Sequence, residues 1–459
     1  MPTVPLQYET LKSVLLYMEP NIRFRISLLM PSISALESRL PLKVENLMFS
    51  REKTNVNRFS YQLGIYFDYG RNEMPFNVHN SNNCGGSSND FDQYGFIIYP
   101  GVNDVLPGDV DLRQGYRHIS RNDSERREQF IVQRLRIYKM LLAEKLNQQY
   151  IEDAETRRIA VGPWDPSLEA SIRRSATNNS VEDIQSVIET NREELRPYNN
   201  RRNNRTPPYT ACIQLTVKST KGYQFQRVLY NKYLYEAEKA MHTKLFVNRD
   251  NIVTVKNLKF NTDNQVLRFP AGTILKIENL EVLRWSASHF ECLTNIIDPS
   301  SFPIQQLKME SSLSSPDFRH SIVKEAKSLV IDNHSFGNAS WTPILLNLTN
   351  RRVCLMNENQ RVPPNNYVNL IEDWLERGRP VGTTFSMGLK NEDTAKQCLD
   401  TLKQRENVLG STEKQVQLRI NASLKLNVSY EMIDHTGSFP SEYASNLWLR
   451  LKVIRRRSE

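Results

Sequence analysis

The stretch "VKNLKFNTDNQVLRFPAGTILKIENLEV", residues 255 to 282, contains one six-residue pattern twice. Each copy begins with an apolar residue and two residues of any type. A leucine, one more residue of any type and a second apolar residue follow. The pattern returns as "IQQLKM" at Ile304 and "AKSLVI" at Ala326, and "NRRVCL" continues it 24 residues later. The start positions, Val255, Ile277, Ile304 and Ala326, differ by 22, 27 and 22 residues, so this part of the chain is an internal repeat.

A repeat of about 20 to 29 residues with leucines at this spacing resembles the leucine-rich-repeat signature. The asparagine of that signature is missing, and the repeat is therefore degenerate: the residues in its place are Asp263, Trp285, Ser312 and His334. Each such unit supplies one strand, and stacked units form a curved sheet that buries what one unit cannot. Alternate strand residues share a face, so the central positions should form one buried ladder, Leu258, Leu280, Leu307, Leu329 and Val353, beside a second row, Phe260, Val282, Met309, Ile331 and Leu355. "VENLMF" at Val44 has the same form and indicates a fragment of the same architecture near the N-terminus.

The residues between these two rows should point to the opposite, concave-type face of the sheet. They are Lys259, Glu281, Lys308, Val330 and Cys354, and we treat them as the candidate substrate face. The first three are charged and predict a solvated surface, whereas Val330 and Cys354 make the C-terminal end more apolar. Uncovered apolar area is where partners dock, so a protein-binding patch is expected at this end.

The chain divides into four segments by composition and periodicity, and together they predict an α+β protein. Residues 1–40 are expected to form short helices broken by prolines, and residues 41–169 a β-rich region with a long amphipathic helix. Residues 170–208 are rich in Asn, Arg and Ser and predict a polar flexible linker. Residues 209–459 hold the repeat-like α/β domain, which ends in a β meander.

Composition favours a folded protein without a membrane segment. Of the 459 residues, 39% are hydrophobic, and no run approaches the ~18 apolar residues that a membrane helix needs. Glu9 and Glu19 argue against a secretory signal or a mitochondrial leader in the first helices. The five cysteines are odd in number and far apart, with no C-x-x-C pair, which is typical of reduced thiols in the cytoplasm or nucleus.

The formal net charge is +9, and part of the excess is local. One arginine group consists of Arg196, Arg201, Arg202 and Arg205, and a second of Arg455, Arg456 and Arg457. A basic patch is typical of nucleic-acid binding, but no recognised nucleic-acid motif accompanies either group. We therefore expect a solvated linker and tail, with no specific nucleic-acid partner, and any such binding should be salt-sensitive and sequence-independent.

Known catalytic and cofactor motifs are absent from the sequence, which predicts a protein that is not an enzyme and uses no cofactor. The loop "NCGGSSNDFDQYGF", residues 83 to 96, lacks the Gly-Lys-Ser/Thr of a phosphate-binding loop. Asp90 and Asp92 resemble the start of a calcium loop, but Gly101 stands where the bidentate Glu belongs. A turn with capping Asn and Asp side chains is the favoured interpretation, and no metal site is expected.

The segment "PLQYETLKSVLLYMEPNIRFRISLLMPSI", residues 5 to 33, has an apolar helical stripe, a proline turn and a second, basic-apolar helix. It resembles a degenerate F-box, a helical hairpin that binds an adaptor. The matching positions are Leu6, Leu11, Val14, Leu15, Met18, Pro20, Arg23 and Ile26. The resemblance implies that these residues bind a Skp-like adaptor protein. The alternative is that the stripe packs on the chain's own next strand, near Leu47.

Further stretches extend this resemblance. "LGIYFDYG", "LPGDVDLR", "YTACIQLTVKS", "SFPIQQLKM" and "WLERGRPVGTTFSMGL" are similar to the expanded nematode group known as F-box C proteins, whose shared domain has no assigned function. The likeness implies a cytoplasmic or nuclear scaffold that joins an unknown substrate protein to a cullin-type ubiquitin ligase. Two alternatives are a free-standing interaction protein with no ligase partner and a weak nucleic-acid-associated basic protein.

Overall fold

The chain folds into two compact units, each built from separate stretches of sequence. Unit 1 comprises Met1–Phe59, Pro107–Arg113 and His242–Glu459, and unit 2 comprises Ser60–Leu106 and Gln114–Met241. The computed structural model describes residues 8–50, 53–98, 105–113, 124–153, 164–246, 249, 252–261, 265–283, 287–311, 316–333, 340–356, 365–432 and 446–456. The boundaries between the units therefore differ from the expected ones at residues 40, 169 and 208.

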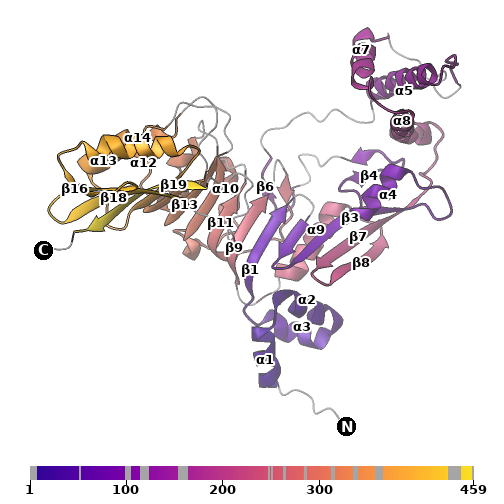
Figure 1. Ribbon diagram of the computed structural model, residues 1–459. Coiled ribbons are helices and arrows are strands. Elements are labelled where there is room, and N and C mark those ends of the chain that lie inside the picture. Colours follow the sequence, from indigo (N-terminus) through magenta and orange to yellow (C-terminus); the bar gives the residue numbers. More distant parts are fainter. Residues whose placement is uncertain are drawn as a thin grey trace. The chain divides into compact units, whose positions relative to one another are not determined.

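Unit 1 begins with three short helices, α1 (Tyr8–Tyr17), α2 (Pro20–Leu29) and α3 (Pro31–Ser38) (Figure 1). Pro20 and Pro31 each open a helix at its first turn, where the missing N–H costs no hydrogen bond. The Glu19 side chain accepts hydrogen bonds from the N–H groups of Asn21 and Ile22 and so caps α2. These helices are the proline-separated ones that the sequence predicts.

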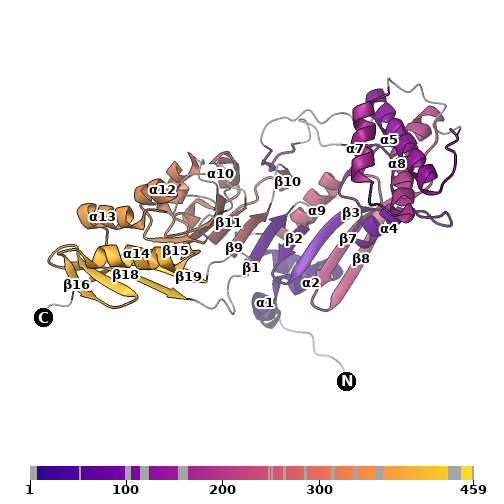
Figure 2. The ribbon, with the colours of Figure 1, turned by 45° about the horizontal axis from the view of Figure 1, so that its top comes forward.

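The sheet of unit 1 combines a run of parallel strands with antiparallel strands at both ends (Figure 2). The spatial order is β16–β17–β18–β19–β15–β14–β13–β12–β11–β9–β1–β2. The bounds are β1 (Lys43–Ser50), β2 (Lys53–Val56), β9 (Val253–Asn261), β11 (Leu275–Val282), β12 (Gln306–Ser311), β13 (Ser328–Asn333), β14 (Arg352–Leu355), β15 (Thr384–Leu389), β16 (Val408–Ser411), β17 (Gln415–Arg419), β18 (Leu424–Met432) and β19 (Leu447–Arg455). A separate antiparallel pair joins β6 (Val110–Asp111) to β10 (Val266–Leu267).

The repeat pattern places its central residues in one line across neighbouring parallel strands. Leu47 of β1 pairs with Leu258 of β9, and the line continues through Leu280, Leu307, Leu329 and Val353. Each of these side chains is at most 3% exposed. The second row, Phe260, Val282, Met309, Ile331 and Leu355, is also buried. The predicted ladder is thereby confirmed, and "VENLMF" forms its neighbouring strand.

The two-residue gap between the first apolar position and the leucine has a structural explanation. In β9, Val255 and Leu258 are both buried although they are three residues apart, so strict alternation is interrupted between them. The asparagines at this interruption pair across three strands: Asn257 Nδ2 donates to Asn46 Oδ1 at 2.9 Å, and Asn279 Nδ2 donates to Asn257 Oδ1 at 2.8 Å. This amide ladder accounts for the asparagine in "VENLMF", "VKNLKF" and "IENLEV".

Helices of unit 1 include α10 (Ala287–Thr294), α11 (Ser321–Glu325), α12 (Thr342–Asn347), α13 (Tyr367–Arg377) and α14 (Glu392–Lys403), with short turns η2 (Pro299–Ser301) and η3 (Pro316–Arg319). Phe385 of β15 continues the leucine line beyond Val353. The Trp374 ring of α13 packs against it, with ring centroids 4.8 Å apart, so α13 covers the leucine-bearing face. At the C-terminal end β17, β18 and β19 are antiparallel, as predicted for a meander.

Unit 2 combines a small antiparallel sheet with a helical layer. Its strands β3 (Phe59–Asp68), β7 (Thr210–Ser219) and β8 (Gly222–Leu229) pair in that order, and β4 (Asp90–Phe91) pairs with β5 (Ile97–Ile98). Its helices are α4 (Phe76–Asn83), α5 (Glu125–Lys145), α7 (Pro166–Ser175) and α8 (Val181–Arg202), and α9 (Leu234–Phe246) leads from unit 2 back to unit 1. Ile65, Phe67, Tyr69, Ile213 and Leu234 form the core beneath the sheet.

Residues 170–208 were expected to be a linker, and this prediction is wrong. They contain the end of α7 and the whole of α8, which begins with a capping box between Ser180 and Asp183. The buried side chains of α8 include Ile184, Ile188 and Leu195, which pack with those of α5 and α7 in one core. A few apolar residues at helical spacing outweigh the polar composition. None of the described helices is both long enough and apolar enough to cross a membrane.

Candidate functional site

Three residues of the apolar stripe of α1 face inward, toward α3, whereas the fourth, Val14, is exposed. Leu15 is buried with Leu36 and Leu40, and Leu11 and Met18 pack against the same cluster. Neither of the two interpretations of the stripe describes this arrangement fully, because its cover comes from α3, the third helix of the same segment. The stripe therefore holds α1 to α3 and defines which side chains remain outside.

The structure places the predicted partner-binding residues in three environments. Leu6 lies outside the described residues. Leu15, Pro20 and Arg23 are buried, so their side chains offer no contact to a partner in this conformation. Leu11, Met18 and Ile26 are half-buried, and Val14 is exposed.

Sequence reasoning missed most of the apolar surface that the three helices present to solvent. Eight large apolar side chains between residues 8 and 30 are exposed: Tyr8, Val14, Leu16, Tyr17, Ile22, Leu28, Leu29 and Met30. We call these eight residues the N-terminal apolar surface. Tyr17 is 93% exposed and Leu29 70%. Leu16, Tyr17, Leu28 and Met30 lie outside the predicted stripes and could have been expected on the opposite sides of the helices. Val14 belongs to the predicted stripe and is nevertheless exposed.

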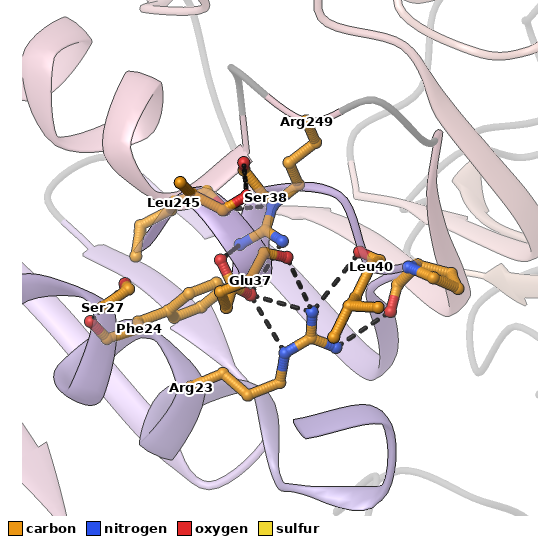
Figure 3. Close-up of polar contacts among 10 residues, drawn as sticks. Arg23, Phe24, Ser27, Glu37, Ser38, Leu40, Leu245 and Arg249 are labelled. Carbon is orange, nitrogen blue, oxygen red and sulfur yellow. Dashed lines mark hydrogen bonds and ion pairs between the residues drawn. The ribbon is translucent and has the colours of Figure 1, made fainter. Parts of the chain in front are cut away.

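A buried ion cluster fixes these helices to the rest of unit 1 (Figure 3). Glu37 of α3 accepts hydrogen bonds from Arg23 Nε at 3.0 Å and from Arg249 at 2.8 Å and 3.0 Å. The two Arg249 bonds form a bidentate fork on the carboxylate, which is the strong geometry for this pair. Arg23 also donates to the carbonyl oxygens of Pro41 and Leu40. Glu37 thus connects α2 with the segment that follows α9, where Arg249 lies 212 positions after Glu37 in the sequence.

The electrostatics of this cluster are unusual because two cations share one anion in a dry environment. The three charged side chains are each at most 5% exposed. Burial lowers the pKa of Arg23, whereas the Glu37 carboxylate opposes that effect. The Arg249 guanidinium also lies 5.6 Å from the centre of the Phe24 ring, within cation–π range. A buried pair of this kind is costly to break, since the remaining partner is left as an uncompensated charge.

A second anchor lies beside β1 and β2. Asn21 Nδ2 donates to the carbonyl oxygen of Val56 at 3.0 Å, and Asn57 Nδ2 donates to Glu19 Oε1 at 3.1 Å. The carboxylate that caps α2 therefore also binds the turn after β2. The helices are held rigidly while their outer surface stays apolar and uncovered among the described residues.

The candidate substrate face forms one line on the opposite side of the ladder strands. Lys259 Nζ lies 3.0 Å from Glu281 Oε1, and Lys308 Nζ lies 2.9 Å from the same oxygen. Burial raises the pKa of Glu281, but the two lysines outweigh it, and the net effect is a lowered pKa. The charges compensate one another across three strands, and all three side chains are half-buried.

The C-terminal end of this line is covered. Val330 is buried with Met356 and Trp448, and Cys354 packs against this cluster. The predicted protein-binding patch at the more apolar end therefore has little uncovered area. Burial raises the pKa of the Cys354 thiol to about 11, so the thiol stays protonated at neutral pH.

The loop at residues 83–96 serves packing and turn geometry. A side chain at Gly64 of β3 would place its Cβ 2.4 Å from the Gly85 carbonyl oxygen, so the loop can approach β3 only at a glycine. Asp90 accepts from the Leu234 N–H and the Tyr230 hydroxyl, and Asp92 accepts from the N–H groups of Tyr94 and Phe96. The turn with capping Asp side chains is confirmed. Within the described ranges no group of three or more His, Cys, Asp and Glu side chains could hold a metal.

Comparison with known proteins identifies one region. A family model described as "Domain of unknown function (DUF3557)" matches residues 233–391, from α9 to just beyond β15. No curated protein and no solved structure matches the chain. The matched residues contain all five predicted ladder strands, so an uncharacterised domain is built around the parallel part of the sheet.

Proposed function

We propose that this protein is a non-enzymatic interaction scaffold whose N-terminal helices bind a Skp-like adaptor. Through that adaptor it would recruit a substrate protein to a cullin-type ubiquitin ligase, in the cytoplasm or nucleus. The proposal extends the resemblance of residues 5 to 33 to an F-box and of the wider chain to the nematode F-box C group. The observation that carries it is the N-terminal apolar surface.

Three features support this function. Exposed apolar side chains concentrated on one short segment are typical of an interaction site. The buried Arg23–Glu37–Arg249 cluster holds that segment in place, and preorganisation lowers the entropic cost of binding. The inward stripe at Leu15 holds α1 to α3 without using the outer residues. An adaptor helix lying on the outer side chains would remove them from water.

A co-purification experiment with a Skp-type adaptor tests the proposal. Leu29→Asp and Tyr17→Asp place a charge on the N-terminal apolar surface at exposed positions, so the fold should tolerate them. Met432→Asp is the matched control, because Met432 is 72% exposed and lies at the end of β18.

Adaptor recovery should fall at least about tenfold for the two N-terminal variants and remain unchanged for Met432→Asp. Equal recovery of adaptor with all variants would refute the proposed surface. Failure of the unmodified chain to retain any adaptor would leave a free-standing interaction protein as the better description.

A further inference from the structure

Strand β8 is an open edge of the unit 2 sheet (Figure 1). Within the described part of the chain it pairs with β7 alone, and all eight of its residues are exposed. Along this ladder each β7 residue has one partner in β8, from Ser219 opposite Gly222 to Cys212 opposite Leu229, without a bulge. The strand β8 contains no proline. Natural proteins usually protect such an edge with prolines, bulges or outward charges. An unprotected edge of this length is a template for another strand.

The one charged side chain of β8 does not protect the edge. Arg227 Nε donates to Gln214 Oε1 of β7 at 2.7 Å. Its guanidinium carbon lies 3.6 Å from the centre of the Tyr66 ring on β3. Arg227 is therefore directed back across the sheet by a hydrogen bond and a cation–π contact, away from the edge.

The backbone groups on the outer side of β8 can be assigned from the pairing. Tyr230 N–H donates to the Ala211 carbonyl oxygen at 3.1 Å, so this pair is hydrogen-bonded. Hydrogen-bonded and non-hydrogen-bonded pairs alternate along an antiparallel ladder. Backbone groups of Tyr223, Phe225, Arg227 and Leu229 consequently point outward, at the two-residue spacing that an incoming strand requires.

The side chains around this edge indicate which strand it would accept. Tyr223 and Phe225 are exposed, and their rings lie parallel with centroids 6.3 Å apart, which suits apolar partner residues. The four charged residues from Tyr209 to Tyr235 are all basic and exposed: Lys218, Lys221, Arg227 and Lys232. Charge complementarity therefore favours an acidic partner segment.

We propose that β8 binds an extended, acidic segment of a partner protein as an additional β-strand. The backbone edge would supply affinity, and the basic and aromatic side chains would select alternating acidic and apolar residues. A single-stranded nucleic acid could use the rings and the charges but not the backbone edge, so the structure favours a peptide. This inference is independent of adaptor binding, because β8 belongs to unit 2 and the N-terminal apolar surface to unit 1.

The test uses the full chain and a fluorescent, end-capped peptide of four Glu-Val repeats, followed by anisotropy. Phe225→Pro removes an outward N–H without removing a bond to β7, since proline is tolerated at such edge positions. Phe225→Ala removes the ring and keeps the N–H. We expect the dissociation constant to rise at least about tenfold for Phe225→Pro and less than about threefold for Phe225→Ala.

Two further arms keep the result independent of folding. A Glu-Val peptide methylated on the amide nitrogens that face β8 should bind the unmodified chain at least about tenfold more weakly. A Lys-Val peptide of the same length should not bind. Unchanged thermal unfolding of Phe225→Pro establishes that the variant is folded.

Several outcomes would overturn the proposal. These are no binding of the Glu-Val peptide at millimolar concentration, equal binding by the methylated peptide, and equal effects of the Pro and Ala variants. Displacement of the peptide by an oligothymidylate that binds more tightly would assign the face to nucleic acid. Self-association of the chain that Phe225→Pro abolishes would assign the edge to a second copy.

Discussion

Glu37 is the residue on which the placement of the N-terminal helices depends. Glu37→Gln removes the anion from between two buried guanidinium groups. We expect a loss of about 3–5 kcal/mol in the free energy of unfolding of unit 1, because each arginine is left as an uncompensated charge. Urea denaturation measures it. Glu45→Gln is the control: its ion pair with Lys256 is exposed and should contribute less than about 1 kcal/mol. A loss as small as the control's would mean that the cluster is hydrated.

His242 is a second residue with a measurable consequence. Its ring is fully buried between Thr54 Oγ1 at 2.7 Å and the Arg268 carbonyl oxygen at 2.8 Å. Burial lowers its pKa to about 4, although the Arg268 carbonyl and Asp109 favour the charged form. Between the ordinary histidine pKa of about 6.5 and this value, the unfolded chain binds the proton and the folded chain does not.

The stability that His242 provides is therefore fully present above pH 6.5 and decreases as the pH falls toward 4. The slope should approach ~1.4 kcal/mol per pH unit in this window. Comparing unfolding free energies at pH 7 and pH 5 measures it, and His242→Gln should remove this contribution to the difference. An identical pH dependence in the variant would show that another group is responsible.

At the scale of elements, α8 shows how spacing can matter more than composition. Its capping box at Ser180 should contribute ~1 kcal/mol, so Ser180→Ala should speed trypsin cleavage at Arg192 and Arg201. In the unmodified chain these sites should resist cleavage until the helical layer opens. Timed digestion with mass spectrometry follows both. Ser186→Ala, at an exposed position of the same helix, is the matched control and should leave the rate nearly unchanged. Early cleavage at Arg192 in the unmodified chain would restore the linker interpretation.

The elements also show what could and could not be predicted from the sequence. The line from Leu258 to Val353 could be predicted, because a repeat fixes which residues share a register. The inward direction of Leu15 could not, since an amphipathic stripe specifies a face but not what covers it. Here the stripe of α1 is covered by α3, and α2 lies between these two helices in the sequence. The bond between Glu37 and Arg249 had no local signal, because the two residues are 212 positions apart.

At the scale of the whole molecule, unit 1 depends on three separate stretches of sequence. Deleting residues 1–40 would remove Glu37 and leave Arg249 without its carboxylate, and would also remove the Asn21 bond to Val56. We expect residues 41–459 to unfold at a clearly lower temperature than the full chain, by calorimetry, whereas Leu29→Asp should unfold near the original temperature. Loss of adaptor binding on deletion would therefore not identify the contact surface. Equal unfolding temperatures of the two chains would show that the helices are an independent appendage.

The long separation between β1 and β9 has a consequence for how the protein is made. When β1 leaves the ribosome its parallel partner has not been synthesised, and Arg249 follows Glu37 by 212 residues. At about 5–20 residues per second, this interval lasts roughly 10 to 40 s. During that time the apolar face of β1 and the carboxylate of Glu37 have no native partners from the β9 region. The nascent N-terminal region should therefore be a client of holding chaperones, and unit 1 should complete its fold only after unit 2 has been translated.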